Sequence, residues 1–283
     1  MPIGPARMPL LDHLGELRMR VVRIVVCMLI AMCVFYLATP TIAQFLLHPV
    51  AGFMPTDENG NVVLSVFGAF DAFSVRFKVA IWSSAVACAP VIIWQVLAFF
   101  LPALKPSERK WFIPTFVIAV VLFIGGTIFC YTIILYPAFQ WLTDQASGFA
   151  NVLPEAAKWI DIIIKFELGF GVAFELPLVV FYLTIFEVIP YGKLRTNWRV
   201  VYVVLLTLSA IITPDASPIT MVLMFGAMIT LYELSLLAAR LVLGKRIKEQ
   251  QRELEQEAKE DAEWEAEWAE RQRRRKSAQE AEE

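Results

Sequence analysis

Long runs of apolar residues recur along the chain and constrain its fold more strongly than any other feature. The first, residues 21–37, is long enough to cross a lipid bilayer, because a transmembrane helix needs about 17–25 mostly apolar residues. Hydrophobic residues make up 58% of the 283 residues, whereas a soluble domain averages about 45–50%. The sequence therefore predicts an integral membrane protein.

Six segments are expected to cross the bilayer, which makes the predicted fold an all-α membrane protein with six transmembrane helices. The fifth segment covers only about 20 Å of a hydrocarbon core that is about 30 Å thick. We therefore expect the last two spans to be short and the external leaflet beside them to be thin. The predicted spans are residues 21–37, 79–101, 111–136, 162–189, 200–212 and 219–239.

Basic residues gather in alternate connections, and this pattern predicts the orientation. They cluster before the first span, between the second and third, between the fourth and fifth, and after the sixth; Arg76 and Lys78 are the exception. By the positive-inside rule, both termini are cytoplasmic in an inner or plasma membrane. We expect a cytoplasmic amphipathic lead-in over residues 1–20, a six-span membrane domain over residues 21–243 and a charged cytoplasmic tail over residues 244–283.

The lead-in contains the segment LLDHLGELRMR, residues 10–20, which has the pattern of an amphipathic helix. Its leucines recur at spacings of three and four residues, whereas Glu16 and Arg20 fall on the opposite face. We interpret it as a short helix on the membrane surface, with Glu16 available to a ligand that arrives there. The alternative is a solvated lead-in whose charges only orient the first span.

The sequence lacks the common motifs for catalysis, metal binding and cofactor binding. It contains no GxxxxGK[ST] phosphate loop, no HExxH and no Gly-rich dinucleotide motif. We expect no enzyme activity, no cofactor and no metal ion. The four cysteines form no CxxC pair and all lie inside apolar runs, which argues against a disulfide framework: Cys27, Cys33, Cys88 and Cys130.

Glu175 lies in the middle of the fourth predicted span, in the segment GFGVAFELPLVVF. A carboxyl group at that depth costs about 2.5–3.5 kcal/mol on insertion scales, so it must face protein or water. It could be a neutral carboxyl that joins helices, or a polar contact or proton site used in transport. A secondary transporter of a small solute or ion is the corresponding alternative function, although the repeated halves typical of such proteins are not evident.

Glu16 and Glu108 each stand beside basic residues at a predicted cytoplasmic interface. Two carboxylates next to apolar surface could receive a cationic, partly apolar peptide. Arginine suits such a site because its guanidinium group pairs with a carboxylate in bidentate geometry.

Four blocks of sequence resemble the TatC family, the TatC subunit of the twin-arginine protein translocase. They occur in the family's order, and the resemblance covers nearly all of residues 8–244. It implies that Glu16 and Glu108 bind the paired arginines of a signal peptide, that Arg18 and Arg109 order that site, and that Phe99 borders it. The four blocks are HLGELRMR, QVLAFFLPALKPSERK, FGVAFELP and TPD.

The resemblance also implies partners and further functional residues. Glu175 matches the intramembrane glutamate of the family, Pro49 a proline of the first external loop, and Thr213 and Asp215 the turn between spans five and six. TatA- and TatB-like single-span subunits would dock near that turn. The resulting oligomer would use the proton gradient to export folded proteins. No nucleic-acid partner is expected. The turn TPDASP is one residue shorter than is common in the family.

Overall fold

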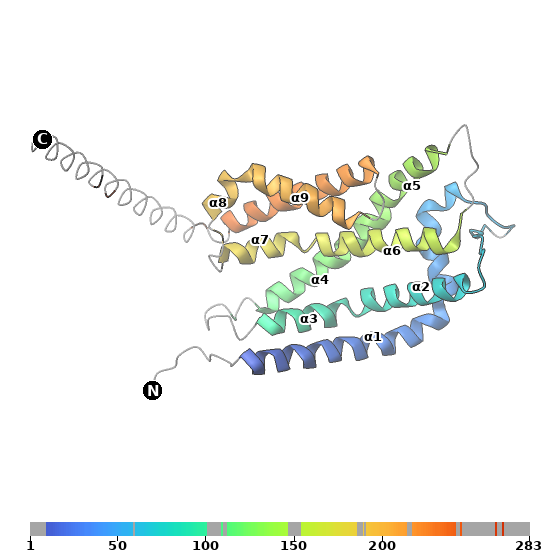
Figure 1. The fold of residues 1–283 in the computed structure, drawn as a ribbon, viewed down its shortest axis with the longest axis horizontal. Helices are drawn as coiled ribbons and strands as arrows, with labels where there is room; N and C mark the ends of the chain where they lie inside the picture. Colours follow the sequence, from blue (N-terminus) through green and yellow to red (C-terminus); the bar gives the residue numbers. More distant parts are fainter. Residues whose placement is uncertain are drawn as a thin grey trace, which may run out of the picture.

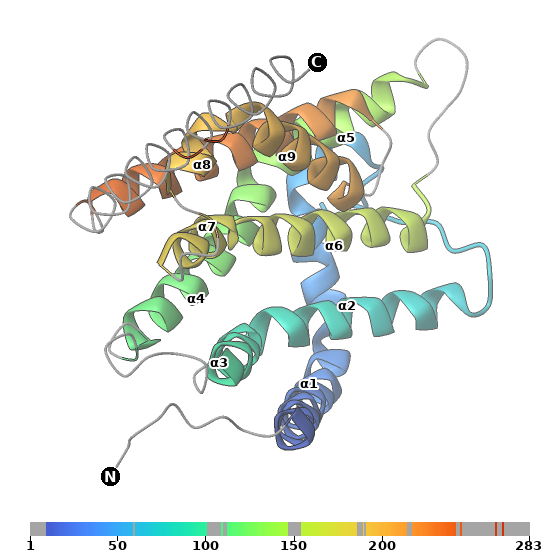
Figure 2. The same ribbon diagram turned by 60° about the vertical axis from the view of Figure 1, so that its left-hand side comes forward.

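The described part of the chain is an array of helices in which the longer members run side by side (Figures 1 and 2). The computed structural model describes residues 10–58, 60–100, 109, 112–146, 154–185, 189, 191–213, 217–241, 244, 264 and 268. Within these residues, β pairing is limited to two isolated bridges, Thr56 with Val62 and Ser65 with Glu155. The all-helical prediction is confirmed for the described residues.

Helix α1, Leu10–Leu47, is a single helix of 38 residues followed by the 3-10 helix His48–Phe53. At 1.5 Å per residue α1 is about 57 Å long, far more than a hydrocarbon core requires. Residues 10–20, expected to form a short helix that leads into the first span, are the first turns of this long helix; their place on the membrane surface stays a prediction. We call the end of the molecule where α1 begins the proximal end and the opposite end the distal end.

The next two long elements are interrupted in different ways. Helices α2, Asp71–Ala87, and α3, Ala89–Phe100, meet at Cys88 with a bend of 58°. Pro90 explains this bend because its ring nitrogen cannot donate the hydrogen bond of a regular helix. By contrast, α4, Phe112–Phe129, continues through a π-helical turn, Cys130–Ile134, into α5, Leu135–Asp144.

Helix α6, Ala156–Ala173, and helix α7, Leu176–Ile185, are separated by a short break at Phe174 and Glu175. Pro177 lies two residues beyond the break and removes a backbone donor there. Two shorter helices follow, α8, Tyr191–Thr196, and α9, Trp198–Ile212. The last helix covers Pro218–Leu241.

Three described helical segments are long and apolar enough to cross a membrane: His13–Phe53, Phe112–Asp144 and Pro218–Leu241; the bent pair α2–α3 would be a fourth. Helix α9 has 15 residues and is short, as the sequence predicts. The last helix has 24 residues, so the expectation that both final spans are short is wrong for the second of them. The count of six spans and the orientation stay predictions.

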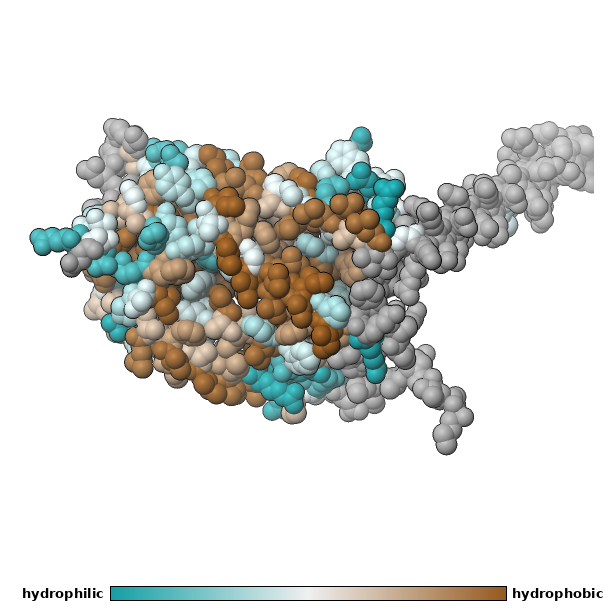
Figure 3. Space-filling view, turned by 180° about the vertical axis from the view of Figure 1, so that it is seen from behind, coloured by the Kyte–Doolittle hydropathy of each residue, from teal (hydrophilic) through white to brown (hydrophobic). Residues whose placement is uncertain are grey.

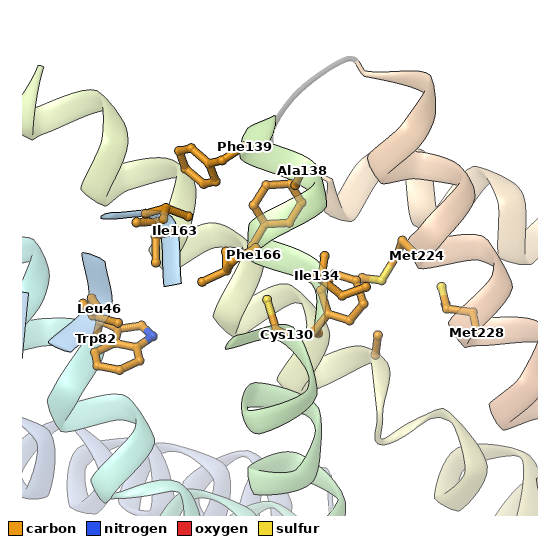
Figure 4. Packing of buried hydrophobic residues seen from close by; sticks show 14 of the residues in the cluster. Leu46, Trp82, Cys130, Ile134, Ala138, Phe139, Ile163, Phe166, Met224 and Met228 are labelled. Carbon is orange, nitrogen blue, oxygen red and sulfur yellow. The ribbon is translucent and has the colours of Figure 1, made fainter. Parts of the chain in front are cut away.

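A buried apolar core joins the helices from both halves of the chain. Figure 4 shows Leu46 and Trp82 on one side of this core, Phe166 and Ile134 in its middle, and Met224 on the other side. Apolar side chains also cover much of the outside: Ile30 and Leu37 of α1 are 65% and 83% exposed. Figure 3 shows broad hydrophobic areas in the middle of one face. Lipid is the solvent that such a surface requires.

Helices α4 and α6 approach each other closely because each of them presents a glycine to the other. A Cβ atom on Gly126 of α4 would lie 2.6 Å from the carbonyl oxygen of Phe170 and 2.9 Å from the Cβ atom of Phe174. One on Gly171 of α6 would lie 2.9 Å from the ring of Phe123. This close contact fixes the backbone of α6 just before Glu175.

Hydrogen bonds hold the last two helices to α8 at the proximal end. Glu233 accepts one from Arg195 Nη1 at 3.0 Å and another from the Tyr202 hydroxyl at 3.0 Å. The buried Tyr232 hydroxyl donates to the carbonyl oxygen of Leu194 at 3.0 Å. These bonds set how α8, α9 and the last helix pack together.

Candidate functional site

The proximal ends of α1 and α3 form a polar cluster around Glu16. The Oε1 atom of Glu16 accepts hydrogen bonds from both Nε, at 3.1 Å, and Nη2 of Arg20, one turn along α1. Arg20 also donates from Nη1 to Oε1 of Gln95 on α3, at 3.2 Å. The arginine therefore links the two helices and fixes the carboxylate in one orientation.

The second carboxylate oxygen of Glu16, Oε2, is buried and has no hydrogen-bond partner among the described residues. The Nδ1 atom of His13 lies 3.9 Å from it, too far for a hydrogen bond. The His13 ring stacks on the Phe99 ring, with centroids 4.2 Å apart and planes inclined by 15°. The cluster therefore offers one unpaired acceptor beside a pair of stacked rings.

The other charged residues predicted for this site are not paired with Glu16 in the described part of the chain. Arg18 is exposed and takes part in no ion pair among the described residues. Arg109 is exposed as well, and Glu108 lies outside the described residues. The residue that holds Glu16 is Arg20, to which the sequence analysis assigned no role, although the spacing of four residues is the usual signal for a Glu–Arg pair on a helix.

Glu175 lies at the break between α6 and α7, directly after the residues that contact α4. Its Oε1 atom is buried and has no hydrogen-bond partner in the described part of the chain. The backbone there is irregular: Glu175 donates to the carbonyl oxygen of Val172, and its own carbonyl accepts from both Leu178 and Val179. The structure thus places an uncompensated carboxyl oxygen where the helix is interrupted.

A second carboxyl group, Glu167 of α6, lies two turns before Glu175 and is more deeply buried. It is 2% exposed, and its Oε1 atom also lacks a hydrogen-bond partner within the described residues. The sequence analysis gave it no role. A signal was available, because any carboxyl in a membrane span needs a polar or aqueous environment.

The residues expected at the external loops occupy different environments. Pro49 is half-buried at the start of the 3-10 helix after α1. Thr213 is buried at the end of α9, where its hydroxyl donates to the carbonyl oxygen of Ser209 at 2.9 Å. Asp215 lies outside the described residues. No group of three or more His, Cys, Asp or Glu side chains in the described part could hold a metal ion.

Comparison with known proteins identifies the family. A family model described as Sec-independent protein translocase protein (TatC) matches residues 12–226. This chain belongs to the TatC family. Its TatC relatives include the proteins of Deinococcus radiodurans, 30% identical over 87% of this chain and 91% of the relative, and Aquifex aeolicus, 30% identical over 87% and 100%.

The fold is also similar to that of a solved TatC. A crystal structure of the twin arginine translocase receptor TatC superimposes with a TM-score of 0.67 at 29% identity, covering 81% of this chain and 98% of that one. Family and fold together support a role in twin-arginine translocation for this chain, as a membrane component of a protein translocase.

Proposed function

We propose that this chain is the receptor of a twin-arginine translocase and that its Glu16 cluster binds the paired arginines of signal peptides on folded cargo proteins. The observation that carries the proposal is the buried Oε2 atom of Glu16, which lacks a donor among the described residues while Oε1 is held by Arg20. A buried, unpaired carboxylate oxygen costs free energy that a bound donor would recover. A signal-peptide guanidinium would supply that donor.

The stacked rings of His13 and Phe99 would favour arginine over lysine at this site. A guanidinium group is planar and can stack on an aromatic face while its N–H groups reach a carboxylate, whereas an ammonium group cannot do both in this way. The resemblance to the family adds Glu108 as the carboxylate for the second arginine, with Arg18 and Arg109 ordering the site.

The proposed topology has six spans, with the proximal end and both termini in the cytoplasm. In this arrangement α6 and α7 together form the fourth span and α9 the fifth, while the basic connections face the cytoplasm by the positive-inside rule. TatA- and TatB-like single-span subunits would dock near Thr213 and Asp215, with Pro49 in the first external loop, and the complex would be oligomeric. Glu175 would serve transport within the membrane.

The alternative, a secondary transporter that uses Glu175, has less support. Membership of the TatC family favours a protein translocase over a solute transporter. The two functions differ in a simple property: only the translocase receptor should bind a twin-arginine peptide.

The test is peptide binding to the purified chain in detergent or nanodiscs. The parent should bind an Arg-Arg peptide more tightly than a Lys-Lys peptide, and Glu16→Ala should weaken Arg-Arg binding by about 2–5 kcal/mol, the range for breaking a desolvated charge pair. Glu58→Ala removes an exposed carboxylate elsewhere and is the matched control. Equal binding by Glu16→Ala and the parent, or no preference for Arg-Arg, would show that the assignment is wrong.

A further inference from the structure

Three charged side chains of α2 and α6 form an ion cluster in the distal half of the helical array. Asp161 accepts from Lys78 Nζ on its Oδ1 atom at 2.9 Å and from Lys165 Nζ on its Oδ2 atom at 2.6 Å. Two ammonium groups thus share one carboxylate, which leaves an excess of one positive charge. The proposed peptide site uses none of these residues.

This lysine cluster is open on its outer side. The side chains of Lys165 and Lys78 are 56% and 39% exposed, although both donate to the same carboxylate. An ammonium group has three N–H donors, and each lysine uses one of them on Asp161. The remaining N–H groups favour a ligand whose acceptor atoms can bind two neighbouring ammonium groups.

The charges nearer the distal end of α6 do not cancel this excess. Lys158 is paired with Glu155 at 2.7 Å, one turn closer to the helix start. Asp71, at the start of α2, accepts from the backbone N–H of Gly68 at 2.6 Å. The Lys158–Glu155 pair is neutral, so it does not compensate the positive excess at Asp161.

The end of α9 shows how deep the cluster lies relative to the local membrane surface. A Cβ atom on Gly169 of α6 would lie 2.5 Å from Cγ2 of Ile212, so the last residue of α9 reaches α6 at that level. Lys165 is one turn further toward the distal end. Figure 1 shows α6 continuing well past the end of α9.

We place the membrane surface beside α9 near the level of Gly169, because polar backbone that protein does not cover cannot remain in hydrocarbon. A helical turn rises about 5.4 Å, which puts the Lys165 ammonium group at the depth of lipid headgroups on this side of the molecule. Lysine side chains also extend toward the interface when they can.

We propose that Lys78 and Lys165 form a binding site for the phosphate group of an anionic phospholipid in the distal leaflet. The phosphodiester carries the single negative charge that the lysine cluster lacks, and its oxygens can accept from both ammonium groups. The acyl chains of the same lipid would lie along the exposed apolar residues that follow on α6 and α7. Val172 and Val179, which are 61% and 54% exposed, provide that surface.

The experiment is native mass spectrometry of the purified chain titrated with phosphatidylglycerol. Replacing Lys165 or Lys78 by glutamine should weaken phosphatidylglycerol binding about fivefold each, the effect expected for one basic residue near an anionic lipid. Lys165→Arg should retain binding because it keeps the charge. Lys158→Gln is the matched control, since it removes an exposed lysine of the same helix that already has its own acidic partner.

Further measurements separate the possible outcomes. Phosphatidylethanolamine should bind more weakly than phosphatidylglycerol, and an excess of inorganic phosphate should not displace the lipid. Each variant is also melted, so that loss of binding is read only from folded protein. Two results would overturn the proposal. The first is unchanged phosphatidylglycerol binding in both Lys→Gln variants, which is expected if an acidic residue of a partner helix is the true occupant. The second is a loss of binding in Lys158→Gln equal to that in the other two variants.

Discussion

The close packing of α4 on α6 leads to a sharp prediction about two adjacent glycines. Gly126 faces α6, and a methyl group there would meet the carbonyl oxygen of Phe170 at 2.6 Å and the Cβ atom of Phe174 at 2.9 Å. Gly125 faces open space. Apart from its own helix backbone and its two chain neighbours, no atom lies within 4 Å of a methyl group placed there. Gly125→Ala and Gly126→Ala therefore make the same chemical change in opposite surroundings.

The magnitude follows from this geometry. The carbonyl oxygen of Phe170 belongs to the backbone of a packed helix, so the two helices must separate to accept the methyl group, and overpacking of this kind costs about 1–3 kcal/mol. Both variants gain about 1 kcal/mol of helix propensity when alanine replaces glycine. The gain is common to both, so the difference in unfolding free energy between them should equal the packing cost alone.

The assay is thermal or denaturant unfolding of both variants in the same detergent. Gly126→Ala should melt below the parent, and Gly125→Ala at or above it. Because Phe174 directly precedes Glu175, Gly126→Ala should also reduce export more than Gly125→Ala does. Equal stability of the two variants, or a lower stability of Gly125→Ala, would refute the view that backbone contact between α4 and α6 positions the break at Glu175.

Three further predictions concern the carboxyl groups and the topology. Glu175→Ala should lower export while leaving peptide binding intact; export retained in Glu175→Gln would indicate a polar contact and count against a proton relay. Glu167→Met should raise the melting temperature, because it removes a buried carboxyl oxygen that lacks a partner among the described residues; a lower melting temperature would reveal a compensating group. In a variant without native cysteines, a cysteine at Glu58 should react with an impermeant thiol reagent from outside the cell and one at Arg109 only after lysis. Labelling of both from outside would contradict the six-span topology.

Much of the architecture could be predicted from local patterns in the sequence. Apolar runs of sufficient length dictate membrane helices whatever surrounds them, because every backbone polar group must be satisfied within the segment. The short α9 was predictable for the same reason, as its apolar run is short. The cost of placing Glu175 in a span also marked it as a residue that needs protein or water around it.

The residues at which a helix begins and ends were harder to predict where a charged segment joins an apolar one. Residues 10–20 have an amphipathic pattern that fits a separate surface helix, yet α1 continues through them without a break. The pattern describes which side chains share a face, and packing of α1 on α3 decides where that face points. The hydrogen bond from Arg20 to Gln95 is a contact of that kind.

The sequence by itself determined that this chain is a helical membrane protein, where its apolar segments lie and which acidic residues are costly. Only the tertiary structure decided what those residues meet on other helices: that Arg20 also donates to Gln95, that His13 stacks on Phe99, and that Lys78 of α2 pairs with Asp161 of α6. The reason is physical. Burial and helix formation depend on nearby residues in the chain, whereas the partner of a charged side chain depends on which helices pack together.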